Sequence, residues 1–230
     1  MRLPDINSFK TYDNYEKIRH MSLNDKIEPL PMHVNILSDK DKVKAIKHVE
    51  NAIIRPSLEY KAYIKFLREK YDMTKCSFFN NVSNEHSKRV KIEIHHSPFT
   101  LFDITSVVAE KQMHEDGEFN YFKIGKEVVQ LHYQCRVGLI PLSSTIHSMV
   151  HNGSIFIPLD CPRGNYISFI EEYDRYLSQD LLAMLEDAYI LTKQTHDLSI
   201  LDTVYTYIDC DGFKLPQFNE TSLAVEHNIK

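Results

Sequence analysis

The chain has 230 residues, of which 43% are hydrophobic and 26% charged, so it can bury the core of one large or two small domains. Its net charge of −5 argues against binding nucleic acid through bulk electrostatics, so any DNA contact needs a local basic surface or a metal ion. No run is apolar enough for a membrane span or a signal peptide, which predicts a soluble, cytoplasmic protein without membrane contact.

Two amphipathic helices are predicted before residue 85. Ser38 and Asp41 have the spacing of a capping box, and apolar residues then recur every three to four positions until Pro56. A second helix over 57–71 carries an aromatic face and several basic residues. Interleaved aromatic and basic side chains can bind nucleic acid, but an ordinary helix with a solvated charged face is the favoured interpretation.

The sequence pattern changes from helical to strand-like after residue 85. Residues 86–94 alternate basic with apolar side chains, as a half-buried strand does, and this strand leads into His95 and His96. Two helices are predicted next, over 100–111 and 122–135. The short apolar run 138–142, interrupted by a proline, fits an edge strand that can pair with the earlier one.

A two-turn helix is predicted to follow this second strand. Ser143 or Ser144 can cap its start, and Asn152 with Gly153 supplies a left-handed stop. The helix carries His147 and His151. Further predicted elements are a strand at 155–159, helices at 166–177 and 179–193, and a strand at 203–208.

The predicted fold class is α+β, a mostly helical chain around a small ββα core. We expect three parts. They are an N-terminal helical region over 1–85, a core over 86–160 with a helical insertion at about 99–137, and a C-terminal helical region over 161–230.

The histidines carry the chemistry of this core. His147 and His151 are four residues apart, so both rings lie on one face of a helix and can bind one metal ion. Taken singly, each histidine is more simply a strand end or a partly exposed helix residue. The combination of strand, His95-His96, second strand and capped helix favours a shared site.

The two segments that carry this combination are Glu93-Ile-His95-His96-Ser-Pro98 and Gly138-Leu-Ile-Pro-Leu-Ser-Ser-Thr-Ile-His147-Ser-Met-Val-His151-Asn-Gly153. Together they resemble the HNH (ββα-metal, His-Me finger) endonucleases of phages and mobile elements. The resemblance implies metal-dependent hydrolysis of double-stranded DNA in the host cytoplasm. Its metal ligands would be His95, His147 and His151, and its general base would be neutral His96. The ion could be zinc, nickel, manganese or magnesium, and imidazole ligands favour the softer ions.

Three departures from the family pattern leave the enzymatic activity open. Gly138 stands where many members have an asparagine that orients the base, and Ser143 and Ile146 stand where a C-x-x-C zinc knuckle would fall. The insertion 99–137 is also longer than the usual hairpin connection. The alternative is therefore a catalytically degenerate HNH-like fold acting as a structural or interaction subunit, for example of a phage assembly. A metal-stabilised regulator without nuclease ancestry is a third hypothesis.

Overall fold

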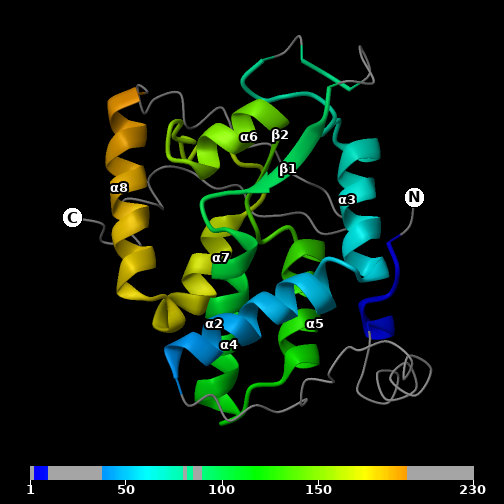
Figure 1. Ribbon diagram of the computed structural model, residues 1–230, viewed down its shortest axis with the longest axis vertical. Helices are drawn as coiled ribbons and strands as arrows, with labels where there is room; N and C mark the ends of the chain where they lie inside the picture. Colours follow the sequence, from blue (N-terminus) through cyan, green and yellow to red (C-terminus); the bar gives the residue numbers. More distant parts are fainter. Residues whose placement is uncertain (1–2, 10–37, 80–81, 85–89, 196–230) are drawn as a thin grey trace. The chain divides into compact units, whose positions relative to one another are not determined.

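The computed structural model describes residues 3–9, 38–79, 82–84 and 90–195 (Figure 1). Its fold is mixed α+β, as predicted, with helices and one two-stranded antiparallel sheet in the described part. Its contacts define two compact units, one formed by 1–63 with 101–130 and the other by 64–100 with 131–230. Among the described helices, none has the length and apolar character needed to cross a membrane.

The first unit is helical. Its first long helix begins where the capping box predicts, because the Ser38 side chain accepts a hydrogen bond from the backbone N–H of Asp41. The helix continues as a π-helical turn and packs against the helix that follows Pro98 in the chain. The elements are α2 (Asp39–His48), η2 (Val49–Ile54), the start of α3 (Leu58–Lys70), α4 (Leu101–Glu115) and most of α5 (Tyr121–Tyr133).

The second unit holds the sheet. Strand β1 (Ile92–His96) pairs antiparallel with β2 (Leu139–Ser143), as the sequence predicted, and His95 lies opposite Ile140. Both histidines lie inside β1 rather than after it, which extends the predicted strand to residue 96. The other edge of β2 is partly covered, because Leu139 exchanges two backbone hydrogen bonds with Arg163.

Gly138, just before β2, allows the two chain segments to approach closely. The backbone N–H of Ser97 donates to the carbonyl oxygen of Gly138 at 3.0 Å. A Cβ atom added at Gly138 would lie 1.9 Å from the carbonyl oxygen of Ser97 and 3.1 Å from the ring of Tyr166. Only glycine fits there, so the close approach of the backbone explains the glycine at position 138 without any catalytic role.

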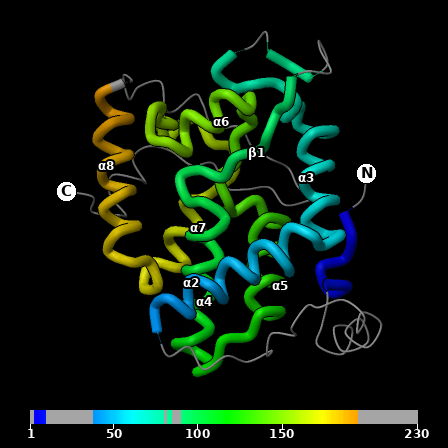
Figure 2. Tube along the Cα trace, in the orientation of Figure 1, coloured from blue at the N-terminus to red at the C-terminus, as the bar shows by residue number. Residues whose placement is uncertain are grey.

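The helices of the second unit complete its core, and the tube in Figure 2 follows their path. The predicted strand at 155–159 is wrong: the chain there is irregular, and Pro158 has no N–H for a ladder. Instead, the N–H of Leu159 donates to the hydroxyl of buried Thr192. The predicted strand at 203–208 lies outside the described residues. The helices that follow β2 in this unit are α6 (Ser144–His151), α7 (Tyr166–Tyr173), η3 (Asp174–Tyr176) and α8 (Gln179–Thr195).

Candidate metal centre

Helix α6 begins directly at the end of β2, and this short connection fixes where its histidines lie (Figure 1). The Ser143 hydroxyl accepts a long hydrogen bond, 3.4 Å, from the N–H of Ile146 and so caps the helix. Ile146 is buried in the core with Ile92, Ile140 and Leu142. Because Ile146 anchors α6 on the sheet, His147 and His151 are held at the same side, one helical turn apart.

Strand β1 brings the third histidine. Side chains alternate along a strand, so Glu93 and His95 share one face, which is the face toward α6. The ring centroid of His95 lies 5.0 Å from that of His147 and 5.1 Å from that of His151. The structure therefore brings together the three residues that the sequence predicted as metal ligands.

The nitrogen atoms of the three rings have the spacing of a metal site. Nε2 of His147 and Nε2 of His151 are 3.2 Å apart, and two nitrogens bound to one tetrahedral zinc ion at about 2.0–2.1 Å lie about 3.3 Å apart. One nitrogen of each of the three rings lies within 4.8 Å of the others. The longest of these separations exceeds the tetrahedral spacing by at most about 1.5 Å.

Glu93 orients one of these rings. Nδ1–H of His147 donates to Oε2 of Glu93 at 2.9 Å, while Nζ of Lys91 lies 2.6 Å from Oε1. The Lys91 ammonium, hydrogen-bonded to Glu93, holds the pKa of this carboxyl below its usual range, so the carboxylate is ionised at neutral pH. Because the carboxylate accepts from Nδ1–H, Nε2 is the nitrogen of His147 that can bind a metal, in place of its 3.2 Å contact with Nε2 of His151.

The burial of His95 favours the form of the ring that binds metal. This side chain is 8% exposed, and burial, followed by the neighbouring His147 and His151, lowers its pKa to about 4. The ring is therefore neutral at physiological pH and keeps a nitrogen lone pair. Metal binding does not have to displace a proton from it.

His96, the predicted general base, lies apart from this cluster. Its ring is on the opposite face of β1, and its Nε2 lies 2.9 Å from Nε2 of His132, at the end of α5. Both rings are buried, and His132 is fully so. His96 is thus part of a buried polar pair with His132, and both residues lie in the second unit.

Sequence reasoning missed two residues of this region. It gave Glu93 no role, although Glu93 precedes His95 by two positions and must share its face. It also gave no role to His132. The signal was present, since His132 follows the apolar Val128 by four positions and therefore continues the buried face of α5.

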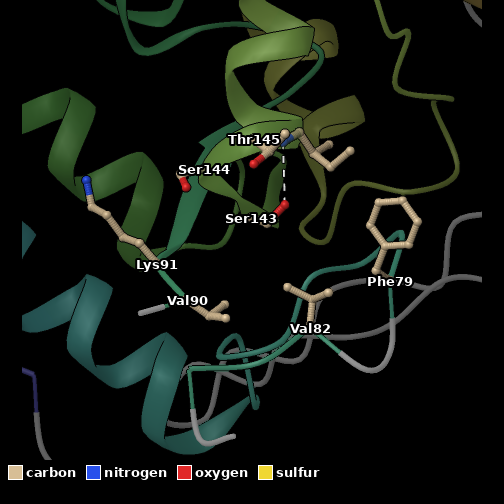
Figure 3. Close-up of a pocket in the computed structure, with 8 residues that line it drawn as sticks. Phe79, Val82, Val90, Lys91, Ser143, Ser144 and Thr145 are labelled. Atoms are coloured by element: carbon tan, nitrogen blue, oxygen red, sulfur yellow. Dashed lines mark hydrogen bonds between the residues drawn. The ribbon is translucent and has the colours of Figure 1, made fainter. Parts of the chain in front are cut away.

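A pocket of about 320 Å³ lies beside the N-terminus of α6 (Figure 3). Its apolar side is formed by Phe79, Val82 and Val90, and Lys91 and Ser143 add polar groups. The three histidines do not line it. The candidate metal centre, to which α6 contributes His147 and His151, is therefore separate from this pocket.

The fold and the site define a mixed α+β protein with a three-histidine candidate metal centre between a β-hairpin and a short helix. A protein-family model described as "Bacteriophage G278-like virion protein" matches residues 4–212, and the chain belongs to this family. No curated protein and no solved structure gives a significant match.

This family corrects the prediction of an HNH endonuclease. That identification is wrong, because the matching family is one of virion proteins and no HNH family matches. The nuclease function rested on that resemblance alone, and so did the catalytic role of His96. The alternative of a subunit of a phage assembly agrees with the family, apart from its HNH ancestry. Binding of a metal ion or of DNA, and a location in the host cytoplasm, stay predictions.

Proposed function

We propose that this protein is a structural subunit of the phage particle, in which a divalent transition-metal ion links α6 to strand β1 of the two-stranded sheet. Membership of a virion protein family supports the structural role. The observation that supports a bound metal ion is the close approach of His95, His147 and His151, in which the Nε2 atoms of His147 and His151 are 3.2 Å apart. Three imidazoles suit zinc, nickel or a similar ion, whereas magnesium prefers oxygen ligands.

The ion would act as a crosslink. It joins His95 in β1 to two residues of α6, which are separated from β1 in the sequence by the whole segment 97–143. An ion bound only by the folded chain stabilises it, and at a free concentration about 100 times its Kd the gain is about 2.7 kcal/mol. Because the free energy of unfolding of a domain is about 5–15 kcal/mol, such a gain is a substantial part of the total stability.

The structural role and the metal are tested separately. Mass spectrometry of purified phage particles should find the chain at a fixed copy number per particle. Absence from washed particles would refute the structural role.

For the metal, thermal unfolding should be measured with zinc and with EDTA. At about 2–4 °C per kcal/mol, the expected rise in Tm with zinc is about 5–11 °C. The rise should vanish in His147→Ala and persist in His114→Ala, a histidine of α4 outside the cluster. Equal shifts in both variants would refute the assignment of the ligands.

A further inference from the structure

The three histidines leave a coordination position unfilled. Zinc bound through imidazoles takes four ligands in tetrahedral geometry. Within the described residues, the group that can hold an ion consists of His95, His147 and His151. The carboxylate of Glu93 contacts His147, but its two oxygens already bind His147 Nδ1 and Lys91 Nζ.

The site opens towards solvent on the side of α6. His95 is buried, the side chain of His147 is 23% exposed, and His151 is exposed. The next residues, Asn152 and Gly153, are exposed too. A ligand that approaches from outside the chain can therefore reach an ion held by the three rings.

The charge at the site selects the kind of ligand. Three neutral imidazoles do not offset the two positive charges of the ion, and the charge of Glu93 is paired with Lys91. An anionic oxygen ligand offsets one of these charges, and zinc binds carboxylate oxygens at about 2.0–2.2 Å.

We infer that the described residues leave the fourth position open and that this position accepts a carboxylate oxygen from outside the chain, which in the particle belongs to a neighbouring subunit. This inference rests on the proposed metal site. A second copy of the chain is one source of such a group, since the sequence has 32 acidic against 27 basic residues. Other subunits are a second source, and both use the same chemistry at the ion.

The test uses the full chain loaded with one equivalent of Co²⁺, whose visible absorption depends on the ligands around it, and acetate as the probe. Acetate should change the spectrum in a saturable way. The change should be absent in His151→Ala, which lacks a ligand, and retained in His114→Ala. Sedimentation of the zinc-loaded chain distinguishes the two sources. If the chain forms dimers and acetate dissociates them, the carboxylate comes from a second copy. If the chain is a monomer whose spectrum responds to acetate, the carboxylate comes from another subunit.

Two results would overturn the inference while leaving the metal site intact. The first is tight Co²⁺ binding with no response to acetate, which means that the chain closes its own fourth position. The second is a response seen in Glu93→Gln alone, which identifies Glu93 as the fourth ligand. If the spectrum of Co²⁺ with the chain stays that of the free hydrated ion, the proposed metal site itself fails, and the inference fails with it.

Discussion

Replacing Gly138 with alanine should separate the end of β1, the strand that carries His95, from the start of β2 and so destabilise the chain. The added Cβ would lie 1.9 Å from the carbonyl oxygen of Ser97, and ordinary contacts begin at 3.4 Å, so the two segments must separate by about 1.5 Å. That movement breaks the 3.0 Å hydrogen bond from Ser97 N–H to the Gly138 carbonyl. Overpacking costs about 1–3 kcal/mol and the lost hydrogen bond about 1 kcal/mol, which together give about 2–4 kcal/mol.

Urea unfolding followed by circular dichroism measures this loss, and the matched control is Gly117→Ala. Gly117 has φ +70° but open space where a Cβ would go, so its replacement costs only the backbone strain, about 1–2 kcal/mol. If Gly138→Ala loses no more stability than Gly117→Ala, the close approach of Ser97 to Gly138 is not a constraint on the fold.

Three further predictions concern the same unit. Thr192→Val should cost about 1–3 kcal/mol in urea unfolding, because the buried N–H of Leu159 loses its acceptor; an unchanged midpoint would contradict the packing of α8 there. Ser143→Ala should cost about 1 kcal/mol through loss of the α6 cap, and a neutral result would mean that the 3.4 Å bond does not stabilise the helix. Burial, together with the carboxylate of Asp160, raises the pKa of Cys161 to about 12. Because the thiolate is the form that reacts, alkylation of Cys161 by iodoacetamide at pH 8.5 should be at least about tenfold slower in the folded than in the unfolded chain. Equal rates, read by mass spectrometry, would contradict that environment.

Local signals in the sequence predicted much of the hairpin and its helix. Ser143 as a cap, Gly153 as a left-handed stop at φ +74° and the i, i+4 pair of His147 and His151 depend on neighbouring residues. The antiparallel partner of β1 was also predictable, because an apolar run with Pro141 fits few other places. These signals correctly placed the three histidines near one another.

Long-range contacts explain what the sequence did not predict. The burial of His132 depends on a contact with His96 across 36 positions, and the need for glycine at 138 depends on the distant Ser97 carbonyl. Residues 155–159 read as a strand because they are apolar, yet their burial comes from packing and not from a ladder. The family was misidentified because short histidine motifs arise readily in a chain with twelve histidines.

The most direct test of the account is a calorimetric titration of the metal-free chain with zinc at neutral pH. We expect one ion per chain in the wild type and in His114→Ala, and no stoichiometric binding in His147→Ala. Loss of binding in His147→Ala alone would establish the three-histidine centre. Binding that is absent from the wild type, or unchanged in His147→Ala, would contradict the claim that His95, His147 and His151 hold a metal ion.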